Sequence, residues 1–333
     1  MATTKQTVTL GKALNMGLRK AMEDDDKVVI LGEDIGKLGG VFRITDGLQK
    51  DFGEHRVLDT PLAESGIVGT AVGLALRGYR PVCEIQFDGF VFPAFDQIIS
   101  QLAKVTYRSQ GAWSMPVVIR IPYGGGIGAV EHHAESPESF FCHIAGLRVV
   151  ACANPQDAYD MIQDAIACQD PVIFLEPKRR YWEKGTVDPE VRTGSGSPFA
   201  AFSSVLRRSG TEATLVGYGA TMPVVLAAAE AAAAEGRALE VFDLRTLSPL
   251  DLDPVVESVR RTGRCVVVAE APREASLASD LAARITEEAF YSLAAPVLRV
   301  TGYDTPYPPS KLEEEYLPDL DKVLAAVDRT LAY

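Results

Sequence analysis

Short apolar runs rich in valine and isoleucine alternate along this chain with longer segments whose apolar residues recur at helical spacing. The runs predicted to be buried strands in the first half are Val28–Leu31, Pro81–Phe87, Val117–Ile121, Leu147–Cys152 and Val172–Leu175. The segments predicted to be helices between them are Thr9–Asp24, Pro61–Leu76, Pro93–Arg108 and Pro155–Ala167. Because helices usually connect the strands of a parallel sheet, this alternation predicts an α/β domain.

The alternation stops between Trp182 and Gly210, where glycine and serine are frequent and apolar periodicity is weak, and then it restarts. Strands are predicted at Ala213–Val216, Leu239–Phe242, Cys265–Ala269 and Val297–Val300, with helices at Pro223–Ala234 and Leu277–Phe290. We therefore expect an α/β fold of two domains, each a mainly parallel sheet with helices on both faces. The expected boundaries are residues 1–184, a linker over 185–210, and 211–333.

Composition narrows the class of protein. The chain has 333 residues, 47% of them hydrophobic, which is enough to bury a substantial core. A net charge of −12 excludes nucleic acid or an anionic membrane as the main partner. The polar start, Met1 to Gly11, lacks the apolar core of a secretory signal, and five cysteines without a Cys-x-x-Cys pair fit reduced thiols. These features predict a cytoplasmic protein without a membrane span.

Two glycine-rich segments resemble nucleotide-binding motifs only in part. Gly124 to Ala129 fits Gly-x-Gly-x-x-Ala, but Glu131-His132-His133 follows where an apolar helix belongs, so a tight glycine turn is favoured. Gly32 to Lys37 is one residue short of a P-loop. Adjacent His132 and His133 would point to opposite faces of an extended chain, and we predict no metal site.

Glu64 is the first candidate for chemistry. It is the only charged residue from Thr60 to Leu76, in a helix expected to be capped by Thr60 and begun by Pro61. A capping box would need the acid one residue earlier. A carboxyl in so apolar a setting has a raised pKa unless a charged partner offsets desolvation. A merely favourable charge near the helix start and a functional carboxyl both remain open.

Two further segments follow predicted strands, at the edge where α/β proteins bind ligands. One carries Gln86 and the aromatic residues Phe87, Phe90, Phe92 and Phe95, which are equally ordinary as core residues. The other, Glu131 to Glu138, holds two of the four histidines of the chain, for which a solvated loop position is the default interpretation.

These segments together resemble one family, the beta subunit of the thiamine-diphosphate-dependent decarboxylase component of 2-oxo acid dehydrogenase complexes. The motifs that carry the resemblance, which runs nearly end to end, are Gly32-Glu33-Asp34, Asp59-Thr60-Pro61-Leu62-Ala63-Glu64, Glu84-Ile85-Gln86-Phe87, Phe92-Pro93-Ala94-Phe95-Asp96-Gln97-Ile98, His133-Ala134-Glu135-Ser136-Pro137-Glu138, Leu175-Glu176-Pro177-Lys178 and Val241 to Asp251. The resemblance implies a transketolase-like pyrimidine-binding domain followed by a transketolase C-terminal domain.

The resemblance also implies roles for particular residues. Glu64 matches the carboxyl that hydrogen-bonds N1′ of the cofactor aminopyrimidine and thereby promotes removal of the thiazolium C2 proton. Leu62 and Gln86 match pocket residues around that ring, and Phe90 matches the aromatic residue that packs on it, often a tyrosine in branched-chain members. His133 matches the histidine that assists acyl transfer to lipoamide.

Partners follow from an absent motif. The Gly-Asp-Gly segment that begins the diphosphate and Mg²⁺ site of thiamine-diphosphate enzymes does not occur in this chain. The resemblance therefore implies that an alpha subunit supplies it in an α2β2 heterotetramer, and a structural monovalent cation is a further expectation. The second domain is expected to dock the lipoyl acyltransferase component. Its tail, Lys311 to Lys322, has five acids against two lysines, and either docks a basic domain or is a solvated acidic face.

The amino-acid sequences of the segments Glu84 to Phe87 and Phe92 to Ile98 resemble those of branched-chain members of the family more than those of other members. We therefore expect a branched-chain 2-oxo acid as substrate, with pyruvate or acetoin as the nearest alternative. A nicotinamide oxidoreductase built on the turn at Gly124, and a non-catalytic scaffold organised by the acidic tail, are the alternatives of a different class.

Overall fold

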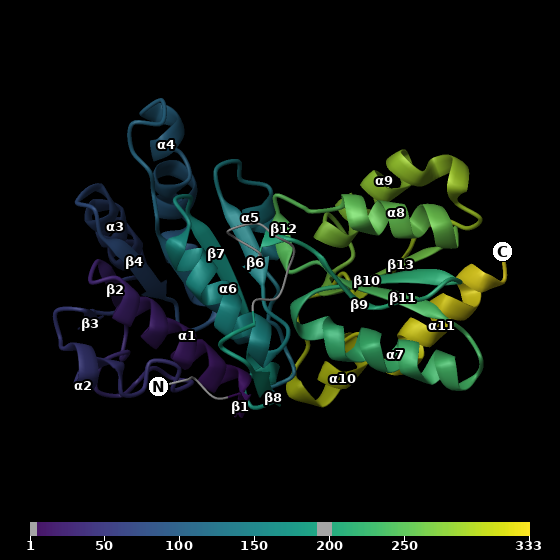
Figure 1. The fold of residues 1–333 in the computed structure, drawn as a ribbon, viewed down its shortest axis with the longest axis horizontal. Helices are drawn as coiled ribbons and strands as arrows, with labels where there is room; N and C mark the ends of the chain where they lie inside the picture. Colours follow the sequence, from purple (N-terminus) through teal and green to yellow (C-terminus); the bar gives the residue numbers. More distant parts are fainter. Residues whose placement is uncertain (1–4, 192–201) are drawn as a thin grey trace.

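Two mainly parallel sheets organise the computed structural model, which describes residues 5–191 and 202–333 (Figure 1). The first sheet has the strand order β12-β6-β7-β5-β4-β2-β3 and the second has the order β14-β13-β10-β11-β9. The first contains β2 (Val28–Gly32), β3 (Val57–Asp59), β4 (Arg80–Glu84), β5 (Val118–Tyr123), β6 (Arg148–Ala151), β7 (Val172–Pro177) and β12 (Thr246–Ser248). The second contains β9 (Val205–Arg208), β10 (Ala213–Gly217), β11 (Leu239–Asp243), β13 (Cys265–Pro272) and β14 (Leu298–Gly302).

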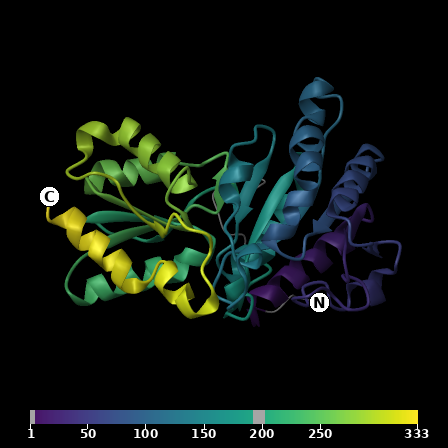
Figure 2. The same ribbon diagram turned by 180° about the vertical axis from the view of Figure 1, so that it is seen from behind.

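Helices cover both faces of each sheet, and the C-terminal helix α11 lies on the second domain, as Figure 2 shows from behind. The α-helices are α1 (Leu10–Asp24), α2 (Leu48–Phe52), α3 (Glu64–Leu76), α4 (Val105–Arg108), α5 (Glu138–Cys142), α6 (Pro155–Ala167), α7 (Met222–Ala234), α8 (Asp253–Thr262), α9 (Leu277–Ala289), α10 (Glu313–Tyr316) and α11 (Leu320–Leu331). The short helical turns are η1 (Asp88–Ala94), η2 (Gln97–Leu102), η3 (Glu131–His133), η4 (Lys178–Arg180), η6 (Gly219–Thr221), η7 (Phe290–Ser292) and η8 (Ser310–Leu312). No helix in the described part of the chain is long and apolar enough to cross a membrane.

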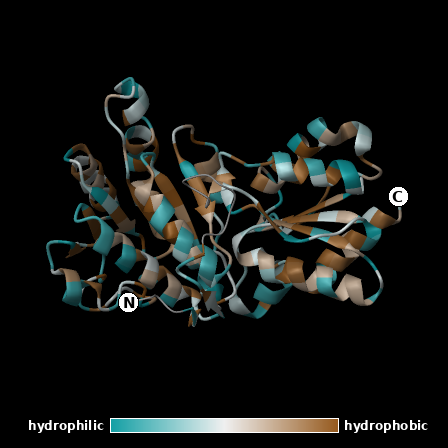
Figure 3. Cartoon of the chain, viewed as in Figure 1, coloured by the Kyte–Doolittle hydropathy of each residue, from teal (hydrophilic) through white to brown (hydrophobic). Residues whose placement is uncertain are grey.

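Spacing of apolar residues decides which helix faces are buried. In α1, Leu10, Leu14 and Leu18 recur every four residues and are all completely buried against the first sheet. Gly17 lets α1 approach α6 closely, because a Cβ atom there would lie 2.4 Å from Cγ2 of Ile162. Figure 3 shows the resulting pattern, with hydrophobic strands inside and hydrophilic residues on the outward faces of the helices.

One hydrophobic core runs through both domains. Tyr123 and Ala151 of the first domain belong to the same buried cluster as Tyr218 and Phe242 of the second. The second domain also adds β12 to the first sheet, where it pairs antiparallel with β6. The two domains expected from the sequence are confirmed, and the structure shows that they are packed together rather than separate.

The segment expected as a linker contains regular structure at both ends. Its first residues belong to β8 (Lys184–Val187), which pairs antiparallel with β1 (Gln6–Thr9), and its last residues form β9 at the edge of the second sheet. Residues 192–201 lie outside the described part of the chain. The segment without regular structure is therefore shorter than the expected linker at both ends, within the part of the chain that the structure describes.

Helix α3 begins three residues later than the sequence predicts. Thr60 was expected to cap it, but the N-cap is Ala63 and no side chain caps the helix. The reason lies in the backbone of Thr60, whose N–H donates to the carbonyl of Gly32 at 3.0 Å and so continues the pairing of β3 with β2. Glu64 consequently is the first residue of the helix, at its positive end.

The prediction of a single helix over Pro93–Arg108 is also wrong. The chain instead forms the 3₁₀ turn η1, the π-helical turn η2 and the short helix α4 in succession. Asp88, at the start of η1, is held by a buried ion pair with Lys178, so the turn begins five residues before Pro93. Turns of π type insert an extra residue into a helix and often occur near functional sites.

A buried carboxyl joins the two domains. Glu138, at the start of α5, is completely buried, and its Oε1 accepts a hydrogen bond from the hydroxyl of Tyr218 at 2.7 Å. The other oxygen, Oε2, has no hydrogen-bond partner in the described residues. Burial raises the pKa of Glu138 to about 7, despite the opposing effect of the Tyr218 hydrogen bond.

Because the pKa of Glu138 is higher in the folded chain than in the unfolded chain, its contribution to stability is complete at acidic pH and is lost as the pH rises to about 7. We expect Glu138→Gln, which stays neutral, to remove this dependence. The free energy of unfolding of Glu138→Gln, relative to that of the wild type, should increase by roughly 3 kcal/mol between about pH 4.5 and pH 7. Urea unfolding at several pH values, with the exposed Glu287→Gln as control, measures this, and a difference that does not change with pH would contradict it.

Candidate active site

The carboxyl ends of three parallel strands meet at one edge of the first sheet. Gly32 at the end of β2 lies level with Asp59 of β3 on one side and with Glu84 of β4 on the other. The segments that follow these strands therefore leave the sheet at the same edge. They carry Glu33 and Glu64 after β2 and β3, and Gln86 after β4.

Two carboxyl groups lie close together at this edge. Glu64 is 7% exposed and Glu33 is 8% exposed. Oε1 of Glu33 is buried and has no hydrogen-bond partner among the described residues. Burial, followed by the nearby charge of Glu64, raises the pKa of Glu33. Since buried polar groups are nearly always hydrogen-bonded, this pair of acids indicates a site whose donor comes from outside the chain.

The surroundings of the two acids are open on one side. Gln86 is half-buried, and its Nε2 donates a long hydrogen bond of 3.5 Å to the backbone carbonyl of Glu33. Leu62, two residues before Glu64, is 80% exposed. Along α3 the residues of the outer face are small and exposed, namely Ser65, Gly66, Thr70 and Gly73. The edge of the sheet is therefore exposed on this side.

His133 lies among aromatic rings beside this edge. Its imidazole stacks on the ring of Phe87, with 4.1 Å between centroids and 16° between planes, and meets the ring of Phe90 edge-on at 5.0 Å. The neighbouring His132 was expected to point away from His133. The chain instead forms the turn η3, in which the two imidazole centroids are 4.2 Å apart.

A buried ion pair anchors these rings. Lys178 follows β7, and its ammonium group pairs with Asp88, the residue after Phe87. The second oxygen of Asp88 accepts a hydrogen bond of 2.9 Å from the backbone N–H of Glu135, in the segment that follows His133. Burial raises the pKa of Asp88 to about 6 and lowers that of Lys178, and the attraction between the two charges opposes both shifts. One pair thus ties together three segments of the site.

A second network of charged side chains is buried within the first sheet. Arg120 on β5 is completely buried and binds both oxygens of Glu176 on β7, at 2.6 and 2.9 Å, and Glu84 on β4. The hydroxyl of Tyr181 donates to Glu176 at 2.6 Å. Such two-pronged contacts fix side-chain geometry. The three central strands are therefore held in register directly beneath the open edge.

Comparison with known proteins assigns both domains. Residues 6–183 match the family model of the transketolase pyrimidine-binding domain, and residues 203–323 match that of the transketolase C-terminal domain. Over 328 residues the chain is 62% identical to the pyruvate dehydrogenase E1 component subunit beta of Leifsonia xyli subsp. xyli, covering 98% of this chain and 96% of that protein. It is 52% identical over 330 residues to the 3-methyl-2-oxobutanoate dehydrogenase subunit beta of Mycobacterium tuberculosis, covering 98% and 92%.

The chain belongs to the family of 2-oxo acid dehydrogenase E1 beta subunits. A pyruvate dehydrogenase E1 component subunit beta of Bacillus subtilis is a further relative, 43% identical over 330 residues that cover 98% of this chain and 99% of that one. Among solved structures, a split-gene transketolase described as an inactive beta4 tetramer shares the fold. Its TM-score is 0.80 at 24% identity, with 98% of each chain covered.

The residues predicted from this E1 beta subunit sequence divide into two connected groups. Glu64 lies beside Glu33, which accepts from Gln86, and Phe90 lies against His133. The chain from Gln86 to Phe90 joins the groups. Leu62 stands apart on the exposed side. Their functional roles stay predictions.

Sequence reasoning left several residues of this edge without a role. Glu33 is a second carboxyl beside Glu64, and the ion pair of Lys178 with Asp88 lies next to the aromatic rings. A signal for Glu33 and Lys178 is present in the sequence, because each charged residue directly follows a buried apolar strand. No comparable signal pairs Asp88 with Lys178, since the two are 90 residues apart in the chain.

Proposed function

We propose that this E1 beta subunit provides one wall of a thiamine-diphosphate site and acts, together with an alpha subunit, in the oxidative decarboxylation of a small 2-oxo acid. The observation that carries the proposal is the pair of nearly buried carboxyls, Glu33 and Glu64, at an open strand-end edge, where Oε1 of Glu33 has no hydrogen-bond partner among the described residues. When bound, thiamine diphosphate supplies an electron sink for the carbanion left by decarboxylation.

The residues of the edge fit the aminopyrimidine half of that cofactor. A ring nitrogen could share a proton with Glu64, which is 7% exposed at the first position of α3. The same proton would compensate the burial of Glu64 at the start of α3. Phe90 offers a half-exposed aromatic ring and Leu62 an exposed apolar side chain for packing.

His133 is suited to handling a proton at the edge of this site. Its Nδ1 lies 2.9 Å from the backbone carbonyl of His132, which can only accept. The proton of a neutral imidazole is therefore placed on Nδ1, and Nε2 keeps its lone pair. Stacking on Phe87 fixes the ring plane. We propose that Nε2 of His133 exchanges a proton with the dihydrolipoyl group during acyl transfer to the lipoyl acyltransferase component.

The alpha subunit is proposed to cover the open side of this edge. Helix α3 presents Ser65, Gly66 and Gly73 outward, so a second backbone can approach closely to the helix that carries Glu64. A Cβ atom at Gly73 would meet nothing within 4 Å in the described chain, and this open space supports the proposed approach of a partner. This arrangement supports an α2β2 assembly in which the diphosphate and Mg²⁺ are held on the other chain.

The substrate has two candidates. The motif Glu84-Ile85-Gln86-Phe87 favours a branched-chain 2-oxo acid, whereas the 62% identical relative is named a pyruvate dehydrogenase subunit. Initial rates of the assembled heterotetramer with pyruvate and with 3-methyl-2-oxobutanoate distinguish them. A preference for the branched acid in kcat/KM supports the first candidate, and a preference for pyruvate supports the second.

Replacing Glu64 by Gln tests the proposed role of the carboxyl. The amide has the same shape but a much lower basicity, so it cannot share the proton of a ring nitrogen. We expect decarboxylation by the heterotetramer, followed with an artificial electron acceptor, to fall by at least about 100-fold. The variant should still assemble with the alpha subunit in size-exclusion chromatography. Turnover close to that of the wild type would exclude the role.

Replacing His133 by Ala separates the two half-reactions. We expect acyl transfer to the lipoyl domain to fall about 100-fold, because general acid–base assistance of that size is lost. Decarboxylation with an artificial electron acceptor should change far less. The matched control is His132→Ala, whose imidazole is exposed and does not stack on Phe87. Equal losses in both assays for His133→Ala would contradict the assignment.

A further inference from the structure

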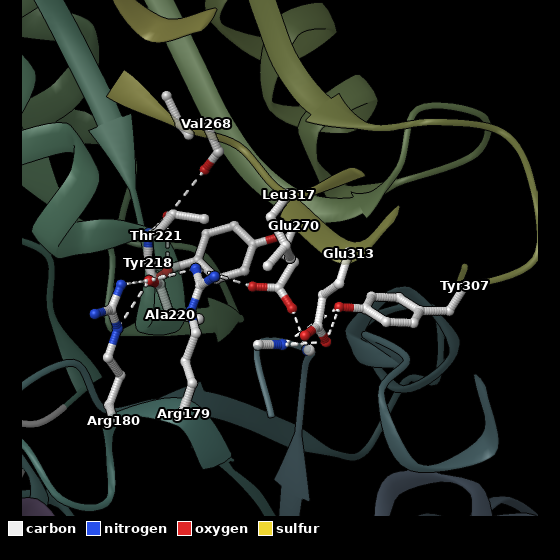
Figure 4. Close-up of polar contacts among 12 residues, drawn as sticks. Arg179, Arg180, Tyr218, Ala220, Thr221, Val268, Glu270, Tyr307, Glu313 and Leu317 are labelled. Carbon is white, nitrogen blue, oxygen red and sulfur yellow. Dashed lines mark hydrogen bonds and ion pairs between the residues drawn. The ribbon is translucent and has the colours of Figure 1, made fainter. Parts of the chain in front are cut away.

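The glycine-rich turn after β5 is bound by the second domain. Gly124, Gly126 and Gly128 have φ angles of +80°, +86° and +70°, a conformation that favours glycine. This turn directs successive backbone N–H groups toward two carboxylates of the second domain. The N–H of Gly125 donates to Glu270 on β13, and those of Gly126 and Gly128 donate to Glu313 on α10. Figure 4 shows the side chains of Glu270, Glu313 and Tyr307 gathered at this place.

Glu313 holds the turn with both of its oxygens. Oε1 accepts from the N–H of Gly126 at 2.7 Å and from the hydroxyl of Tyr307 at 2.6 Å, while Oε2 accepts from the N–H of Gly128 at 3.0 Å. The residue is 8% exposed, although it belongs to the acidic tail that was expected either to dock a basic domain or to be solvated. Charge-assisted, bidentate hydrogen bonds of this kind fix geometry strongly.

The fit between the turn and the second domain leaves no room for side chains. A Cβ atom at Gly125 would lie 1.7 Å from the Tyr307 hydroxyl, and one at Gly124 would lie 2.8 Å from Oε1 of Glu270. Two glycines are therefore required for the approach of Tyr307 and Glu270. The glycine pattern that resembled a nucleotide-binding motif thus serves contact between domains.

The clamped turn leads directly to His133. The segment is closed at its base, where the N–H of Gly124 donates to the carbonyl of Glu135 at 2.8 Å. None of residues 126–133 is buried, so few side chains within the segment fix its position. A cavity of 320 Å³ lies between the residues that follow His133, from Ala134 to Pro137, and Tyr307 and Tyr316 of the second domain. The segment therefore depends on its backbone hydrogen bonds, and Glu313 supplies two of them.

We propose that Glu313 is a positioning residue for acyl transfer, which acts through the Gly126 and Gly128 amides to place His133 against Phe87 and Phe90. The proposal rests on the function proposed above for His133. Through Glu313, the second domain would take part in acyl transfer by positioning His133. It would do so without touching the carboxyl pair of Glu33 and Glu64.

The test uses Glu313→Gln in the assembled heterotetramer. A glutamine keeps the shape and one acceptor oxygen, but its NH2 group faces an amide N–H in place of the second oxygen. We expect acyl transfer to the lipoyl domain to fall about tenfold, because a small misplacement of a reacting group has an effect of this order. The loss should be in kcat rather than in KM for the lipoyl domain, and decarboxylation with an artificial acceptor should fall much less. The exposed neighbour variant Glu314→Gln is the matched control and should match the wild type in both assays.

Hydrogen exchange supplies a second readout that a general loss of stability would not mimic. In Glu313→Gln, amide exchange should accelerate selectively in the segment 124–135, with unchanged protection in the first sheet. Tyr307→Phe removes the hydroxyl that donates to Glu313 but keeps the ring, and it should produce the same pattern at smaller amplitude.

Three outcomes are distinguishable. Selective loss of acyl transfer together with selective exchange in residues 124–135 supports the proposal. Wild-type acyl transfer in Glu313→Gln, or equal losses in both half-reactions, overturns it. If His133→Ala itself retains acyl transfer, the proposed function of His133 fails, and that result is separate from any effect of Glu313.

Discussion

A carboxylate shielded from water with no hydrogen-bond donor is unfavourable, and this constraint governs the open edge of the first sheet. Glu64 begins α3 next to a second buried acid, Glu33, whose Oε1 has no hydrogen-bond partner in the described chain. The fold holds them there because β2, β3 and β4 end level with one another. A site of this kind is complete only when a ligand proton and a further wall are added.

The remainder of the structure supports that edge from two sides. Below it, Arg120 ties β4, β5 and β7 through Glu84 and Glu176, so the strand ends cannot shift independently. Beside it, the pair of Lys178 and Asp88 sets the ring of Phe87, on which His133 stacks. The second domain contributes through hydrogen bonds to the glycine turn rather than through residues at this edge. The Arg120 network, the Lys178–Asp88 pair and the glycine turn thus all support the residues at this edge of the first sheet.

The alternation of apolar runs predicted the sheets well, because a strand buried on both faces is mostly apolar, as in β2, β7 and β10. It failed where a long-range interaction decides the local structure. Thr60 continues a strand pairing instead of capping a helix, and Asp88 starts a 3₁₀ turn because of Lys178, 90 residues away. Glu313 read as part of an acidic surface, since nothing local shows that its partners are backbone amides of another domain. The candidate residues Glu64, Gln86 and His133 were found through family motifs, and periodicity alone left each of them open.

The central claim is that this chain forms only half of a cofactor site. Isothermal titration of thiamine diphosphate with Mg²⁺ into the isolated chain, and then into the chain assembled with its alpha partner, measures it most directly. Our account predicts no measurable binding to the isolated chain and stoichiometric binding to the heterotetramer. Stoichiometric, tight binding by the isolated chain would contradict it.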